Sequence, residues 1–156
     1  MLYLYIAASS TEIERAKAVV DLVKNHNRMY PHAKIEITNH WWETIEARGD
    51  ANPVDAPFHE RMKYAAEDLD GVMCCDILLL LMPPVGVGTV GAYWEAGYAD
   101  AMRKDVVIAG DMLERSIFTT RGCCFNEDQS AVDYIADIAF NNFDTNKEIT
   151  LEPRVY

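Results

Sequence analysis

Apolar residues along the chain alternate between short continuous runs and longer segments in which they recur every three or four positions. Continuous runs predict strands buried on both faces, and the spaced segments predict helices with one buried side. The predicted strands are residues 2–7, a strand marked by Ile35 and Ile37 that ends at His40-Trp41-Trp42, residues 76–82, residues 106–109 and a short fifth strand at 123–125.

The predicted helices lie between these strands, at about residues 13–23, 58–69, 92–102 and 130–140. This alternation of strands and helices is the pattern of a parallel sheet covered by helices. The expected fold is therefore a single-domain Rossmann-like or flavodoxin-like α/β sandwich of three layers, with a mostly parallel sheet of about five strands. The domain is expected to span residues 1–156.

Three loops are expected to line a ligand site, because ligands of parallel α/β sheets bind at the carboxyl ends of the strands. These loops are residues 7–11, 83–91 and 110–121. The second loop has the outline Gly-x-Gly-x-x-Gly of a dinucleotide fingerprint. It follows the third strand, however, and no acidic residue is placed to hold a ribose, so no cofactor is expected.

The net charge and the cysteine content indicate which classes of binding partner to expect. The chain has 14 Lys and Arg against 25 Asp and Glu, a net charge of −11. Such a surface repels phosphate backbones, which disfavours a nucleic-acid polymer but allows a nucleoside or mononucleotide in a local pocket. No secretory signal or membrane span is recognisable, so a cytoplasmic protein without a membrane partner is expected. The adjacent pairs Cys74-Cys75 and Cys123-Cys124, and the spacing of the histidines, predict free thiols and no bound metal.

The stretch Gly91–Ala99 (GAYWEAGYA) carries the strongest chemical signal. A glycine-rich loop leads into a helix, and Glu95 is expected near the first turn, where free N–H groups and the helix dipole favour an ionised carboxylate. A carboxylate at the mouth of a parallel sheet can act as a nucleophile. The small residues Gly97 and Ala99 are expected to let the helix approach the sheet. The alternative is a glutamate that only complements the dipole.

This stretch resembles the helix that carries the nucleophilic glutamate of nucleoside 2-deoxyribosyltransferases. Residues 67–72 (EDLDGV) resemble that family's Asp-Leu-x-Gly-Ile stretch, and Ile6-Ala7-Ala8-Ser9 is similar to the turn that opens its site. The resemblance covers most of residues 1–120. It implies transfer of deoxyribose between nucleobases, with Glu95 as nucleophile and Asp68 contacting or protonating the departing base.

Two positions leave alternatives open. Where the transferases commonly have an aspartate six residues before the nucleophile, this chain has Thr89. In the related 2′-deoxynucleoside 5′-phosphate N-hydrolases a hydroxyl residue binds the 5′-phosphate, and Thr89 with the amide of Gly91 resembles that arrangement. Ser116 matches either a serine that a neighbouring subunit contributes there or the transferases' asparagine. Hydrolysis of 5′-monophosphates is therefore the close alternative, and a nucleotide-sensing module without turnover is the alternative of another class.

The remaining expectations concern substrate contacts and assembly. The resemblance implies that Ala7, Ser9 and Tyr5 line the site, and that the carboxylate of Tyr156 enters a neighbour's site. Tyr3, Tyr5 and Trp41-Trp42 are candidates for stacking on a base or for the core. The few apolar residues of the segment 146–156 suit docking on another surface. A homo-oligomer, dimer or higher, is expected, with a nucleoside or nucleotide and a free nucleobase as small-molecule partners.

Overall fold

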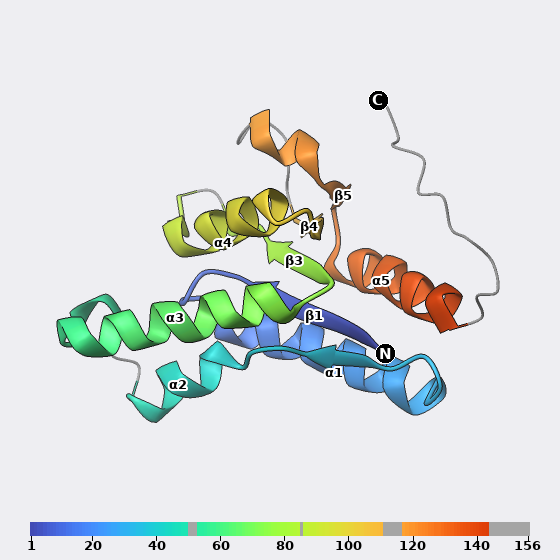
Figure 1. The fold of residues 1–156 in the computed structure, drawn as a ribbon, viewed down its shortest axis with the longest axis horizontal. Helices are drawn as coiled ribbons and strands as arrows, with labels where there is room; N and C mark the ends of the chain where they lie inside the picture. Colours follow the sequence, from blue (N-terminus) through green and yellow to red (C-terminus); the bar gives the residue numbers. More distant parts are fainter. Residues whose placement is uncertain (50–52, 85, 111–116, 144–156) are drawn as a thin grey trace.

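In the computed structural model, five strands form one parallel sheet in the order β2-β1-β3-β4-β5 (Figure 1). The structure describes residues 1–49, 53–84, 86–110 and 117–143. The predicted α/β sandwich with a parallel sheet is confirmed. The strands are β1 (Leu2–Ala7), β2 (Ile35–Ile37), β3 (Ile77–Leu81), β4 (Asp105–Ala109) and β5 (Cys123–Phe125).

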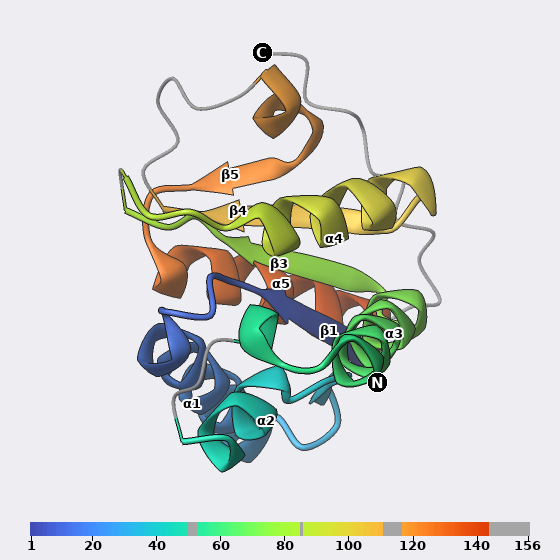
Figure 2. The ribbon, with the colours of Figure 1, turned by 90° about the vertical axis from the view of Figure 1, so that its left-hand side faces the viewer.

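Helices cover both faces of the sheet (Figure 2). On one face α1 (Ile13–Met29) packs against α5 (Asp128–Phe143), and on the other α3 (Phe58–Cys74) packs against α4 (Val90–Ala101). The short helix α2 (Trp41–Ala47) follows β2. Two 3₁₀ turns, η1 (Pro53–Asp55) and η2 (Ile117–Arg121), lie in connections.

The side chains of the central strand β1 divide between the two layers. Leu4 and Ile6 join the apolar cluster under α1 and α5, whereas Tyr5 and Ala7 join the cluster under α3 and α4. This follows from the alternation of side chains along a strand. Tyr5 consequently lies under the two helices that carry Asp68 and Glu95.

Several element boundaries differ from the predicted ones because tertiary contacts decide them. Trp41 and Trp42 begin helix α2 instead of ending a strand. The indole of Trp41 donates to the carbonyl of Ile6 at 2.8 Å, and Trp42 is buried. Helix α1 continues to Met29 through a polar stretch, since the Asn27 amide bonds both the N–H and the carbonyl of Ile35 at 2.8 Å.

Arg15 joins four segments at the carboxyl edge of the sheet. Its guanidinium donates to both carboxylate oxygens of Asp128, at 2.8 and 2.6 Å. It also donates to the carbonyls of Met82 (2.6 Å) and Ala109 (3.3 Å), at the ends of β3 and β4, and to Glu12 at 3.1 Å. One side chain therefore ties the starts of α1 and α5 to two central strands.

Replacing Arg15 by methionine is expected to lower the free energy of unfolding by about 2–4 kcal/mol, because Asp128 and two carbonyls lose their donor. Urea unfolding followed by circular dichroism measures the change. Arg28→Met, on the exposed side of the same helix, is the matched control and should cost less than about 0.5 kcal/mol. A loss below about 1 kcal/mol for Arg15→Met would contradict a structural role for this network.

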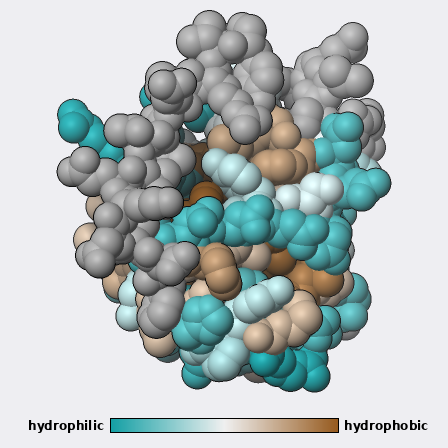
Figure 3. Space-filling model, turned by 90° about the vertical axis from the view of Figure 1, so that its right-hand side faces the viewer, coloured by the Kyte–Doolittle hydropathy of each residue, from teal (hydrophilic) through white to brown (hydrophobic). Residues whose placement is uncertain are grey.

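The face seen in Figure 3 carries both hydrophilic and hydrophobic side chains. Hydrophilic residues run in a band across this face, with smaller hydrophobic areas on either side of it. No helix in the described part of the chain is long and apolar enough to cross a membrane.

Candidate functional site

A cleft of about 420 Å³ lies at the carboxyl edge of the sheet. Its walls come from the segments that follow β1, β2 and β3 and from helices α3 and α4. The predicted loops after the first and third strands do line it, as parallel sheets lead one to expect. Five of the predicted site residues are brought together there, namely Glu95, Asp68, Ser9, Thr89 and Gly91.

Glu95 lies in the second turn of α4, because the helix already begins at Val90 with Thr89 as its N-cap. Glu95 is thus near the first turn as predicted, but one turn beyond the free N–H groups that were expected to favour its ionised form. Burial and the nearby charge of Asp68 instead raise the pKa of Glu95 to about 7, against a smaller lowering by the hydroxyl of Tyr5. The carboxyl is poised to change charge near neutral pH.

Asp68 supplies a second carboxyl group to the same cleft, from the interior of α3. Burial raises its pKa to about 6, Glu67 adds to the rise, and a hydrogen bond from Asn39 opposes it. That bond runs from Asn39 Nδ2 to Asp68 Oδ1 at 2.9 Å. Since Asp68 also raises the pKa of Glu95, the two carboxyls titrate as a pair that holds one proton between the two pKa values.

Tyr5 and Ala7 lie beneath the cleft, and neither is among the residues that line it. Both are fully buried. The Tyr5 hydroxyl makes no hydrogen bond of ordinary geometry to the described residues, but it is close enough to act on the pKa of Glu95. Burial, Glu95 and Asp68 together raise the pKa of Tyr5 strongly. Tyr5 is thus a neutral hydroxyl under the carboxyl pair, whereas the sequence suggested a ring that contacts the substrate.

Gly71 explains how α3 brings Asp68 over Tyr5. A Cβ at Gly71 would lie 2.8 Å from Asn39 Cβ and 2.9 Å from the Tyr5 ring, so only glycine allows this approach. Gly97 has no such function, because a Cβ there would meet nothing within 4 Å. The prediction that Gly97 lets α4 approach the sheet is wrong. The fully buried Ala99 makes that contact.

Two buried residues with hydroxyl side chains, Ser9 and Thr89, lie where α4 begins. Ser9 donates to the carbonyl of Gly88 at 3.2 Å and therefore accepts from the Thr11 hydroxyl at 2.9 Å, which joins the loop after β1 to the loop before α4. Thr89 is 7% exposed and lines the cleft, yet its hydroxyl makes neither a capping bond nor any other with the described residues. Beside it, Gly91 is in the first turn, whose N–H groups have no helical partner.

Two predicted residues, Ser116 and Tyr156, lie outside the described residues, so the roles given to them and the homo-oligomer stay predictions. Sequence reasoning missed Asn39, Arg48 and Tyr64, which also line the cleft. Arg48 Nη1 donates to Glu60 at 2.5 Å and to the Tyr64 hydroxyl at 3.0 Å. Applying the rule on strand ends to β2 would have flagged Asn39, which comes two residues after that strand.

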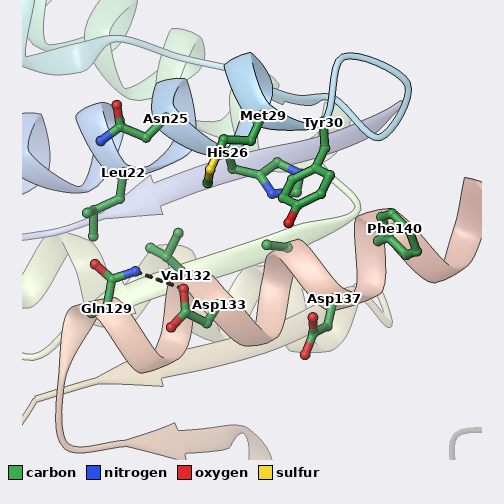
Figure 4. A pocket seen from close by; sticks show the side chains of 11 residues that line it. Leu22, Asn25, His26, Met29, Tyr30, Gln129, Val132, Asp133, Asp137 and Phe140 are labelled. Carbon is green, nitrogen blue, oxygen red and sulfur yellow. Dashed lines mark hydrogen bonds between the residues drawn. The ribbon is translucent and has the colours of Figure 1, made fainter.

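A larger cavity of about 610 Å³ lies between α1 and α5, under the other face of the sheet (Figure 4). Its polar side chains include Asp133, which accepts from Gln129 at 2.8 Å, and Asp137 one turn further along α5. Both lie on the face of the sheet opposite the helices α3 and α4 that carry Asp68 and Glu95. Within the described residues, no group of three His, Cys, Asp or Glu is arranged to hold a metal ion.

Comparison with known proteins finds similar solved structures. No family model matches the chain, and no curated protein sequence matches it significantly. Among solved structures, that of the Clostridium botulinum CMP N-glycosidase BcmB is similar, with a TM-score of 0.52 and 15% sequence identity over 87% of this chain and 98% of that chain. At this identity the likeness establishes a shared α/β fold.

Proposed function

We propose that the protein cleaves the N-glycosidic bond of a 2′-deoxynucleoside or its 5′-monophosphate, with Glu95 as nucleophile and Asp68 as acid. The observation that carries the proposal is the pair of carboxyl groups in one cleft, with pKa values of about 7 and about 6. Two carboxyls with separated roles are what glycosidic cleavage requires. The resemblance of residues 67–72 and 91–99 to deoxyribosyltransferases, and the activity named for the BcmB fold neighbour, support the same bond.

In the first step the bond between C1′ and the base nitrogen breaks. The electron pair leaves with the base, which takes the proton of Asp68, and positive charge develops at C1′. Ionised Glu95 stabilises that charge and forms an ester bond from its Oε to C1′. In the second step an acceptor attacks C1′, its proton passes to Asp68, and the ester bond to Glu95 breaks. Both carboxyls then return to their starting states.

The acceptor decides between transfer and hydrolysis. A second nucleobase gives transfer of deoxyribose, the reaction that the resemblance favours, and water gives hydrolysis. Hydrolysis of a 5′-monophosphate is the second candidate, and Thr89 is the observation that favours it. Its hydroxyl makes no hydrogen bond with the described residues, and it is the N-cap of a twelve-residue helix, where N–H groups and the helix dipole favour an anion.

Two parallel incubations test the proposal. In the first, each 2′-deoxynucleoside is mixed with a different free base. In the second, each 2′-deoxynucleoside 5′-monophosphate is kept in water alone. Chromatography then follows the products. A new nucleoside supports transfer, and free base with sugar phosphate supports hydrolysis. Saturable nucleotide binding with no base release from either panel would overturn the proposal in favour of a sensing module.

Replacing Thr89 by valine separates the two candidates. If its hydroxyl binds the 5′-phosphate, kcat/KM for the monophosphate is expected to fall about 10- to 100-fold, as for a lost hydrogen bond to a charged group. The nucleoside, which has no phosphate, is the internal control and should change less than about threefold. An equal loss on both substrates, measured in the same preparation, would contradict a phosphate contact.

A further inference from the structure

Asn39 links the segment after β2 to the acidic stretch of α3. Its Nδ2 donates to Asp68 Oδ1 at 2.9 Å and to the backbone carbonyl of Glu67 at 3.2 Å. A backbone carbonyl only accepts hydrogen bonds, so the nitrogen of the amide must face it. The contact with Glu67 therefore fixes which way the Asn39 amide is turned, and it identifies Asp68 Oδ1 as an acceptor.

This hydrogen bond determines where a proton on Asp68 can be. An amide N–H₂ group donates and cannot accept, so Oδ1 has to receive its hydrogen and cannot also carry one toward it. Because the carbonyl oxygen of a carboxylic acid is its stronger acceptor, the hydrogen bond at Oδ1 favours a proton on Oδ2. A free carboxyl group would exchange its two oxygens by rotation, whereas the hydrogen bond from Asn39 favours one of the two arrangements here.

The packing around Asn39 leaves the amide little freedom. The Cβ atom of Asn39 lies against Gly71, close enough that a Cβ at that position would be 2.8 Å away. Asn39 is half-buried and lines the cleft together with Asp68. Two features therefore hold Asn39 against α3. Gly71 leaves room for its Cβ atom, and its amide is hydrogen-bonded to Asp68, three residues before Gly71.

We propose that Asn39 is a positioning residue for the acid, which occupies Oδ1 of Asp68 and so presents the proton on Oδ2 to the departing base. The inference rests on the proposed function, since it assigns Asn39 a part in that reaction. Asn39 acts through Asp68 and need not touch the base. Its hydrogen bond also lowers the pKa of Asp68, against the larger effect of burial.

Asn39→Leu tests this role, because leucine has a similar size and no donor. The expected result is a fall in kcat of about 10- to 100-fold with KM changed less than about threefold, since the acid is still present but no longer directed. The pKa of Asp68 should also rise when the hydrogen bond that lowers it is removed. Asp68 works in its protonated form, so the alkaline limb of the pH–rate profile should move to higher pH.

Carbon-13 NMR titration of the Asp68 carboxyl measures the same pKa without any substrate. Thr38→Val, at the neighbouring position outside the cleft lining, is the matched control and should move neither the titration nor the profile. A wild-type enzyme whose Asn39→Leu variant keeps its kcat, its alkaline limb and its Asp68 titration would overturn the inference. A wild-type protein that releases no base would overturn the proposed function instead, so the two failures are distinct.

Discussion

Glu95→Gln is expected to reduce the rate of base release by at least about 10³-fold, a loss of about 4 kcal/mol of transition-state stabilisation. The amide keeps the shape of the side chain but has no negative charge to place against C1′, and it cannot form the ester. Initial rates of base release at pH 7 measure the effect. Glu36→Gln, on the exposed side of β2, is the matched control and should stay within about twofold of wild type.

The same variant is expected to be more stable than wild type at high pH. Folding raises the pKa of Glu95 from its ordinary 4.5 to about 7. The unfolded chain therefore loses its proton first, and wild-type stability falls as the pH rises from 4.5 to about 7. Glutamine does not titrate, so Glu95→Gln should gain about 1–3 kcal/mol over wild type at pH 8 and little at pH 5.

Thermal and urea unfolding at these two pH values measure the difference. The combination of a lost activity with a gained stability is what separates a buried functional carboxylate from one that supports the fold. Wild-type turnover in Glu95→Gln would remove Glu95 from the mechanism. A variant less stable than wild type at pH 8 would show that the ionised carboxylate stabilises the fold, contrary to the direction of its pKa.

The fold was readable from the sequence because its strands are short apolar runs and its helices are periodic. The Ile77–Leu81 strand is buried along its whole length, and so it stands out. The predicted ends of helices and strands were wrong where a contact with a residue distant in the sequence overrides the local pattern. The local sequence predicts that Trp41 ends a strand, whereas its indole donates a hydrogen bond to the carbonyl of Ile6, 35 positions away, and Trp41 begins a helix.

For a related reason, the sequence predicted the two carboxyl groups of the site but not the residues that surround them. Glu95 and Asp68 were recognised as candidates because their local stretches are distinctive, but the surroundings that set the pKa of Glu95 were not predicted. The sequence suggests the helix dipole, while burial and a second carboxyl depend on how α3 and α4 pack, and they act in the opposite direction. Contacts between remote residues leave no local signal, as with the hydrogen bond between Asn39 and Asp68 (29 positions apart) or the ion pair of Arg15 and Asp128 (113 positions apart).

Asp68→Asn is expected to slow release of ordinary nucleobases by about 10²- to 10⁴-fold, because asparagine has no acidic proton for the departing base. Two changes in the pH–rate profile should accompany the loss. The wild-type profile should be bell-shaped with its maximum between about 6 and about 7, where the pair holds one proton, because only the form with that proton on Asp68 and with Glu95 ionised reacts. The variant should lose the alkaline limb. The limb that remains should be that of Glu95 alone, with a pKa below about 7, since the charge of Asp68 no longer raises it.

A substrate with an activated base identifies the role of Asp68 directly. The 7-methylguanine deoxynucleoside already carries a positive charge on its base and departs without a proton. Asp68→Asn should therefore cleave it at close to the wild-type rate, within about tenfold, while ordinary deoxyguanosine is strongly slowed. Asp70→Asn, on the exposed side of the same helix, is the control for local disturbance of α3. Equal slowing of both substrates by Asp68→Asn would mean that Asp68 holds the substrate and does not protonate it.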